Sequence, residues 1–211
     1  MIPVKVLAVQ YLSAVTPAMR KALGTDAPCL GLITTDSDDP TYIALDQATK
    51  DALVTVCYGR SFYAGAGNST TPYAGEVIGI LAGPTPGAVR SGMESALSEL
   101  QRVGFEEVNG VPCLAHTVSR CGSFLSKEAG VPEGSPIAYL IAPPLESMYA
   151  LDAALKAADV KLCKLYTPPT ETNFGGGLLT GTQSACAAAC AAFRDAVAEV
   201  AGNPNKERHY G

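Results

Sequence analysis

Short apolar runs alternate with longer amphipathic stretches along this chain. The runs "VKVLAVQYL" and "CLGLITT" are short and rich in β-branched residues, which is typical of buried strands. A helical pattern follows Thr41, then come a strand at "LVTVCYG", a Gly- and Pro-rich loop and a strand at "GEVIGILAG". A further helix is predicted over 86–101. The first half of the chain is therefore predicted to have the order β–β–α–β–β–α.

The second half repeats this order. "ALDQATKDALVTVC" begins at Ala44 and "ALDAALKAADVKLC" at Ala150, and eight of their fourteen positions are identical without a gap. "PCLAHTVSR", "DVKLCKLY" and "FGGGLLTG" match strands of the first half, and a helix is predicted over 182–201. Duplication explains this pattern best. We expect an α+β protein of two tandem modules, 1–109 and 110–211, with mostly antiparallel sheets and flanking helices.

The repeated helix carries detailed expectations. A hydroxyl at an N-cap accepts an otherwise unpaired backbone N–H, so Thr41 and Ser147 are predicted N-caps. Two i, i+4 ion pairs are predicted on the exposed side, Asp46–Lys50 and Asp152–Lys156. The predicted buried positions are Leu45, Ala48 and Ala52 in the first copy and Leu151, Leu155 and Ala158 in the second.

Charge and cysteine content narrow the class of protein. The net charge is −5 and no basic run occurs, so no nucleic acid or anionic membrane partner is expected. Neither a signal peptide nor an apolar window long enough for a membrane span is found. The seven cysteines form no CxxC pair and indicate a reduced, cytosolic protein. Cys186 and Cys190 share a helix face and are interpreted as core residues, so no metal and no cofactor are expected.

No enzyme is predicted. His116 lies in a strand pattern typical of a structural histidine, and His209 lies in a polar C-terminal tail. Nothing in the sequence around Cys121 lowers the pKa of its thiol. A nucleophile, a base and an acid therefore cannot be assembled.

Several long segments carry a family resemblance. "LGLITTDSDDPTYIALDQATK", "YGRSFYAGAGNST", "AGEVIGILAGP", "VSRCGSFLSKEAG", "AYLIAPPLESMYALDAALKAADV" and "PPTETNFGGGLLTGTQSAC" resemble the EutL-type shell proteins of ethanolamine-utilisation bacterial microcompartments. The resemblance implies a tandem, circularly permuted microcompartment-shell domain. It further implies a homotrimeric, pseudo-hexagonal tile with a gated central pore, lying among neighbouring shell proteins in a flat lattice within the bacterial cytoplasm. Two copies per chain give such a trimer six quasi-equivalent units.

The two copies differ in their acidic residues. The turn "DSDDP" of the first copy aligns with "APPLE" of the second, so Asp36, Asp38 and Asp39 have no acidic counterparts. Glu76 likewise aligns with Phe174. Carboxylates at a helix N-terminus are stabilised by the helix dipole, and this alone could explain Asp36 and Asp38.

Asp39 and Glu76 are interpreted as ligands for a small ammonium group, which needs charged acceptors. Phe105 is either a cation–π wall or an ordinary core residue, and Thr172 could hydrogen-bond a hydroxyl. The family resemblance points to ethanolamine as the ligand, bound between the two modules.

Two Gly-rich loops at equivalent positions, 59–75 and 167–177, are predicted to line the pore and to gate it. The candidate pore residues are Arg60, Ser61, Tyr63, Asn68, Asn173, Phe174 and Gly175. Because the ligand would favour one arrangement of the loops, we expect ethanolamine to favour the closed pore. Ordinary surface connectors are the alternative interpretation of the loops. Two other functions stay open: a trimeric small-molecule-sensing regulator, and a tile of a related diol or choline compartment.

Overall fold

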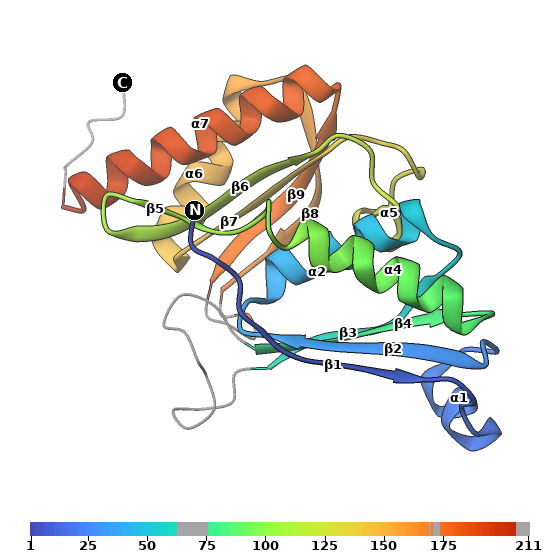
Figure 1. Ribbon diagram of the computed structural model, residues 1–211. Helices are drawn as coiled ribbons and strands as arrows, with labels where there is room; N and C mark the ends of the chain where they lie inside the picture. Colours follow the sequence, from blue (N-terminus) through green and yellow to red (C-terminus); the bar gives the residue numbers. More distant parts are fainter. Residues whose placement is uncertain (63–75, 169, 171–173, 206–211) are drawn as a thin grey trace. The chain divides into compact units, whose positions relative to one another are not determined.

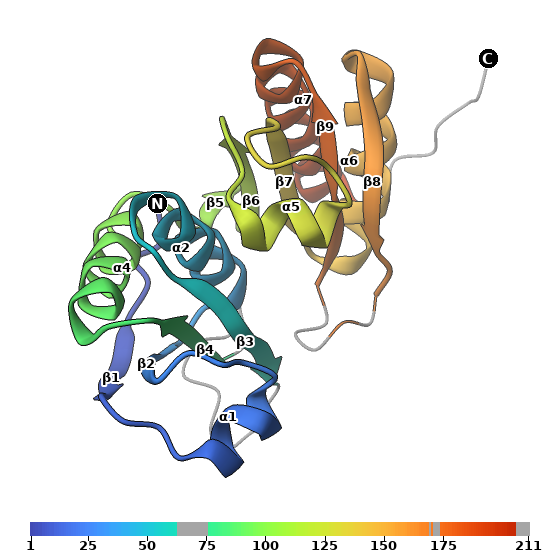
Figure 2. The ribbon, with the colours of Figure 1, turned by 90° about the vertical axis from the view of Figure 1, so that its right-hand side faces the viewer.

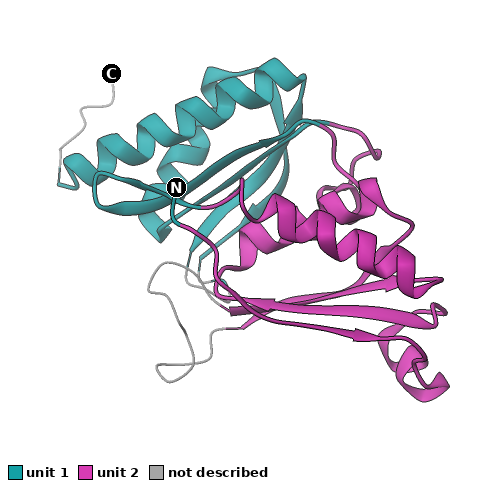
Figure 3. Cartoon of the chain, viewed as in Figure 1, with its two compact units in different colours: residues 1–2, 105–119, 136–211 teal, residues 3–104, 120–135 magenta. Residues whose placement is uncertain are grey.

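The computed structural model describes residues 1–62, 76–168, 170 and 174–205. The described chain divides into two compact units (Figure 3). Unit 2 comprises residues 3–104 and 120–135, and unit 1 comprises residues 1–2, 105–119 and 136–211. The predicted module boundary at residues 109 and 110 stays a prediction, because it concerns the sequence repeat and not the contacts that define these units.

Unit 2 is built on an antiparallel sheet in the order β1-β2-β4-β3 (Figure 1). Its elements are β1 (Val6–Leu12), α1 (Pro17–Leu23), β2 (Cys29–Thr35), α2 (Asp38–Asp51), β3 (Thr55–Phe62), β4 (Glu76–Gly83), α4 (Pro86–Glu99) and α5 (Ser123–Ala129). Helices α2 and α4 pack on the sheet through a core that includes Ile33, Leu45, Leu81 and Met93.

Unit 1 repeats this architecture with the sheet order β5-β6-β7-β9-β8 (Figures 1 and 2). Its elements are β5 (Glu106–Val108), β6 (Val111–Val118), β7 (Ile137–Ala142), α6 (Pro144–Ala157), β8 (Val160–Tyr166), β9 (Gly175–Gly181) and α7 (Gln183–Gly202). Phe193 of α7 is fully buried in a core formed with α6 and the sheet.

The duplication extends to local irregularities of the sheets. The β3–β4 ladder shifts register between Val56 and Tyr58, and the β8–β9 ladder shifts between Leu162 and Lys164. These shifts fall on the matched residues Cys57 and Cys163. A bulge changes the twist of its strand, so both copies retain the same strand curvature.

The predicted strands and the α+β class are confirmed, and α4 and α7 match the predicted helices over 86–101 and 182–201. The predicted N-caps were wrong. Helix α2 is capped at Ser37 and α6 at Pro143, four residues before Thr41 and Ser147. The hydroxyl of Thr41 instead donates to the carbonyl of Ser37 at 2.7 Å, one turn back inside the helix.

The predicted burial is confirmed for Leu45, Ala48 and Leu151. Ala52, Leu155 and Ala158 are only half-buried, so those predictions were too strong. Ala52 and Ala158 are the C-cap residues of their helices, where the chain already turns away from the core.

Candidate functional site

The acidic turn of the first copy is where β2 ends and α2 begins. The carboxylate of Asp36 accepts the backbone N–H of Lys5 at 2.8 Å and ties the turn to the start of β1. Asp38 and Asp39 occupy the first turn of α2, and both are buried. The backbone N–H of Asp39 donates to Oδ1 of Asp38 at 2.9 Å. Helix-dipole stabilisation therefore applies to Asp38 and Asp39, whereas Asp36 is explained by its hydrogen bond to the residue before β1.

The Asp38 carboxyl is protonated more easily than an ordinary aspartate. Burial raises its pKa from 3.8 to about 6, although hydrogen bonds from the Asp39 backbone and the Ser61 side chain lower it. The Asp38 carboxyl is therefore still mostly ionised at neutral pH, and it takes up a proton as the pH falls through about 6.

Ser61 connects this acidic pair to Tyr42. The Ser61 side chain hydrogen bonds with both Asp38 and Tyr42, and burial raises the pKa of the Tyr42 phenol. Ser61 is itself buried near the end of β3. Arg60 beside it is exposed. The end of β3 that leads into residues 63–75 is therefore anchored to the start of α2.

Glu76 begins β4 at the same end of this sheet. Thr35 is paired with Val77, and Phe62 is paired with Glu76, so Glu76 lies one residue beyond the last β2–β4 pair. The acidic turn leaves β2 at that point. In unit 1 the last β7–β9 pair is Ala142 with Gly175, so Phe174 lies one residue beyond it in the same way. The matched pairs Arg60 with Ile78 and Tyr166 with Gly176 give the same offset, so by register the counterpart of Glu76 is Phe174, as the sequence alignment predicted.

Phe105 and Phe174 meet inside unit 1. Their ring centroids lie 5.8 Å apart at an interplanar angle of 61°, an edge-to-face arrangement. Phe105 is buried and its carbonyl accepts the N–H of Ile2. The Phe174 carbonyl accepts the hydroxyl of Thr170 at 2.9 Å. The candidate ligand residue Phe105 thus supports the base of the second candidate loop.

Backbone geometry fixes the point where that loop enters β9. Gly176 has a φ of +147°, and a Cβ there would lie 1.8 Å from the carbonyl oxygen of Leu140. At Gly175 a Cβ would lie 2.7 Å from Oγ of Ser147. Only glycine suits position 176, since both φ and space exclude a side chain.

The structure groups Asp39, Glu76, Arg60 and Ser61 within unit 2, and Phe105, Phe174 and Gly175 within unit 1. Tyr63, Asn68, Thr172 and Asn173 lie outside the described residues. The ligand and pore assignments therefore stay predictions.

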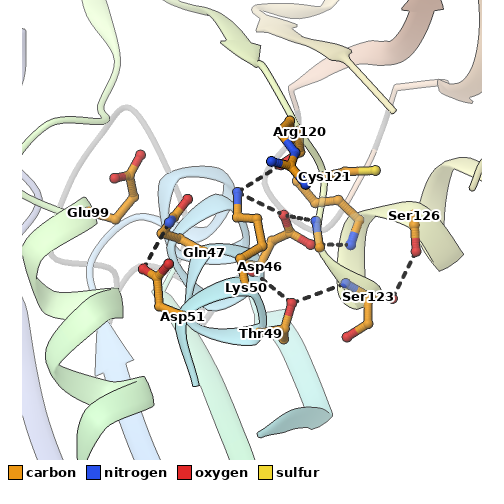
Figure 4. Close-up of polar contacts among 12 residues, drawn as sticks. Asp46, Gln47, Thr49, Lys50, Asp51, Glu99, Arg120, Cys121, Ser123 and Ser126 are labelled. Atoms are coloured by element: carbon orange, nitrogen blue, oxygen red, sulfur yellow. Dashed lines mark hydrogen bonds and ion pairs between the residues drawn. The ribbon is translucent and has the colours of Figure 1, made fainter. Parts of the chain in front are cut away.

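Sequence reasoning missed a polar contact centred on Asp46 (Figure 4). Asp46 was expected on the exposed side of its helix, but it is fully buried. Its carboxylate accepts the backbone N–H groups of Gly122 at 2.7 Å and Leu125 at 2.8 Å, both at the start of α5. Lys50 remains near Asp46 at 3.5 Å and donates to the carbonyl of Arg120 at 3.0 Å. The expectation failed because a helix from the second sequence repeat covers this face of α2.

No group of three or more metal-binding side chains occurs among the described residues. Cys186 and Cys190 are buried in the unit 1 core, as expected of small apolar residues. Burial raises the pKa of the Cys121 thiol, which lowers its nucleophilicity at neutral pH.

A protein-family model described as the BMC domain matches residues 29–112. The match begins at β2, although β1 pairs with β2 in the same sheet. Over nearly its full length, the chain is 59% identical to the bacterial microcompartment shell protein EutL of Clostridium perfringens, across 205 residues and 94% of both chains. It is 54% identical to Escherichia coli EutL across 179 residues, 83% of this chain and 82% of that protein.

The chain belongs to the EutL family of bacterial microcompartment shell proteins. The crystal structure of EutL from Leptotrichia buccalis superposes with a TM-score of 0.92 at 55% identity and covers 98% of both chains. A crystal structure described as the trimeric shell protein PduB has a TM-score of 0.80 at 18% identity, covering 94% of this chain and 90% of that one, so it supports the fold alone.

Membership in this family also assigns the chain a structural, non-catalytic role in a microcompartment shell. Within the described part of the chain, every helix is too short or too polar to cross a bilayer.

Proposed function

We propose that this EutL-family chain assembles as a homotrimer, and that the trimer is a pseudo-hexagonal tile in the shell of an ethanolamine-utilisation microcompartment. The observation that carries the proposal is the 59% identity to Clostridium perfringens EutL over 94% of both chains. The repeated module supports it, because three chains with two similar modules each provide six similar edges for a flat lattice.

The proposed regulatory ligand is ethanolamine, which carries one ammonium and one hydroxyl group. Asp39 and Glu76 would accept hydrogen bonds from the ammonium, Phe105 would contribute an aromatic face, and Thr172 would bond the hydroxyl. The acidic turn of unit 2 supports this proposal. Burial raises the pKa of Asp38, which means that its ionised form is destabilised in the folded chain, and a bound cation would offset that cost.

The proposed pore is lined by the loops 59–75 and 167–177, and ethanolamine favours its closed state. Ser61 lies in the part of the first loop that belongs to β3, Glu76 directly follows the loop, and Ser61 is hydrogen-bonded to Asp38. Phe174 is the last residue before β9 and contacts Phe105. A ligand held by these side chains would bind most tightly to one loop arrangement, and would therefore shift the populations of the two pore states.

Isothermal titration calorimetry tests the ligand assignment. Ethanolamine should bind measurably, whereas propanediol lacks the ammonium and choline presents no N–H donors, so both should bind at least about 10-fold more weakly. Asp39→Asn should weaken ethanolamine binding by about 10-fold or more without changing the oligomeric state. Glu94→Gln, an exposed change on α4, is the matched control and should have no effect. Equal affinity in Asp39→Asn and the parent chain would remove Asp39 from the site.

Electron microscopy at high protein concentration separates a tile from a sensory regulator. A tile should form extended flat sheets, because its edges are built to pair with neighbours. A regulator should stop at the closed trimer. Crystals grown with and without ethanolamine would then show whether the ligand favours the closed pore, and a more open pore with ligand would contradict the proposed direction.

A further inference from the structure

One asparagine of the chain is followed directly by glycine, and this is Asn109 before Gly110. In such a pair the backbone nitrogen of the glycine can attack the side-chain carbonyl carbon of the asparagine, because glycine has no side chain to hinder the approach. The four other asparagines precede larger residues, and they are Asn68, Asn173, Asn203 and Asn205. The Asn109–Gly110 pair is therefore the most reactive candidate for deamidation in the sequence.

This pair forms the turn of the hairpin between β5 and β6. Val108 is paired with Val111, so Asn109 and Gly110 make up the whole loop. Their φ angles are +48° and +83°, which is characteristic of a two-residue type I′ turn. Within the described part of the chain, Asn109 is the one non-glycine residue with a positive φ. Asparagine and glycine suit the turn because both tolerate the left-handed conformation.

The geometry of this turn keeps the two reacting atoms apart. A type I′ turn has a ψ of about +30° at its first central residue, which places the Cβ of Asn109 nearly opposite the backbone nitrogen of Gly110 about the Cα–C bond. Closure of a five-membered ring needs these two atoms on the same side of that bond. The folded hairpin therefore excludes the attack, and the reaction requires the turn to open.

The side chain of Asn109 is also fixed to helix α7. Its Nδ2 donates to the carbonyl of Ala198 at 2.8 Å, one turn before the helix ends at Gly202. A Cβ on Gly202 would lie 3.2 Å from the same Nδ2, so the amide lies directly against this turn of the helix. Strand β5 lies beside α7 (Figure 1), and Arg194 of α7 is paired with Glu106 of β5 at 3.2 Å. Opening of the turn must therefore break the hydrogen bond from Asn109 to α7.

We propose that Asn109 is a deamidation site that the folded hairpin protects, and that its conversion permanently releases the hairpin from α7. The backbone nitrogen of Gly110 attacks Cγ of Asn109, the Cγ–Nδ2 bond breaks, and ammonia leaves with the proton of the Gly110 N–H. The product is a five-membered succinimide. Water then opens this ring at one of its two carbonyl carbons and yields aspartate or isoaspartate. Water is the only co-reactant, and nothing is oxidised or reduced.

Both products lose the contact with α7. A carboxylate has no N–H, so the carbonyl of Ala198 loses a donor and faces a negative charge instead. Carbonyl groups near a helix C-terminus already carry a partial negative charge, so they repel the carboxylate. Isoaspartate also adds one atom to the main chain of a turn that has only two residues. A hairpin that has opened and reacted therefore cannot return to its original contact.

Peptide mapping of the full chain by mass spectrometry tests the protection. At mildly alkaline pH, Asn109 should convert in the urea-unfolded chain and at least about 10-fold more slowly in the folded chain, because only the opened fraction reacts. Gly202→Val displaces the Asn109 amide from α7 and should raise the rate in the folded chain several-fold. Ala187→Val, an exposed change on the same helix, is the matched control and should leave the rate unchanged.

Two results of this experiment would overturn the proposal. Equal rates in the folded and unfolded chains would show that the hairpin gives no protection. An absence of conversion in the unfolded chain would remove Asn109 as a deamidation site. Both results would leave the proposed tile unaffected, since the hairpin and α7 belong to one chain.

Hydrogen exchange tests the release of the hairpin separately. Asn109→Asp reproduces the aspartate product, and Asn109→Gly removes the side chain while keeping a residue that suits the turn. The amides of Val108 and Val111 should exchange at least about 10-fold faster in Asn109→Asp than in the parent chain, with Asn109→Gly between them. Exchange in Asn109→Asp at the rate of the parent chain would show that the carboxylate does not release the hairpin.

Discussion

Asp46 and Asp152 occupy the same position of a duplicated helix, yet Asp46 is fully buried while the side chain of Asp152 is 63% exposed. The sequence around them is nearly the same, and both are followed four residues later by a lysine. The difference lies in what covers them. Helix α5 covers Asp46, whereas Asp152 is exposed to solvent and hydrogen-bonded to Lys156.

The first prediction compares these two aspartates. Asp46→Ala leaves two buried N–H groups without an acceptor, so the free energy of unfolding should fall by about 2–4 kcal/mol. Asp152→Ala should change the stability of the dissociated subunit by less than about 0.5 kcal/mol, because its ion pair with Lys156 is exposed. Urea unfolding of dilute protein measures both. A similar loss of unfolding free energy in the two variants would show that the buried hydrogen bonds of Asp46 do not stabilise the chain.

The pattern of apolar residues was sufficient for the longer strands and the long helices, because each has the periodicity of its type over several residues. The three-residue strand β5 was missed, since its segment was interpreted as a polar turn. Helices α1 and α5 were missed, since seven residues are too few to show a helical period. Residues typical of helix ends were nevertheless present in the sequence. Thr16 and Pro17 mark the start of α1, and Gly24 and Gly130 mark the ends of both helices.

The burial of Asp46 could not be predicted from its own helix, because its partners Gly122 and Leu125 lie more than seventy residues away. The sequence predicted the position of Asp38 and Asp39 but not their burial. Two acidic residues at a helix start were evident, but their electrostatics also depend on Ser61, which lies in β3. The local sequence pattern therefore predicted the longer strands and the long helices, whereas contacts between distant segments determine the electrostatics of the candidate site.

The second prediction concerns the pH dependence of ethanolamine binding. If the ligand ammonium displaces the proton that the Asp38 carboxyl carries at low pH, binding releases that proton, and affinity falls once pH drops below about 6. A single proton with this pKa weakens binding by about 10-fold between pH 7 and pH 5. Calorimetry in buffers of different ionisation enthalpy measures both the affinity and the proton release. Constant affinity over this range would exclude the exchange.

The third prediction concerns stability. Burial raises the pKa of Asp38 in the folded chain to about 6, so between about pH 4 and pH 6 the folded state holds more proton than the unfolded state. The free energy of unfolding should therefore fall as pH rises through this window and level off above it. The shift corresponds to about 3 kcal/mol at most. Asp38→Asn should remove this decline, and the difference between the two chains in denaturant unfolding isolates Asp38 from other titrating groups.

The fourth prediction concerns the entry of the second candidate loop into β9. Gly176→Ala places a Cβ against the carbonyl of Leu140 at a φ that only glycine adopts readily, so we expect a loss of more than about 3 kcal/mol. Gly87→Ala, in the first turn of α4, is the control. A Cβ at Gly87 would lie 3.9 Å from Oγ1 of Thr85, and stability should stay the same or rise by up to about 1 kcal/mol. Equal behaviour of the two variants in thermal unfolding would contradict the geometry at Gly176.

The central claim is that a chain of two similar modules closes into a three-subunit tile. Sedimentation equilibrium of the purified protein tests it most directly, because each chain weighs 21.7 kDa and the possible assemblies differ by whole multiples of that mass. We predict a single species of three chains across dilution into the low micromolar range. A species of one chain or of two chains under the same conditions would contradict the account.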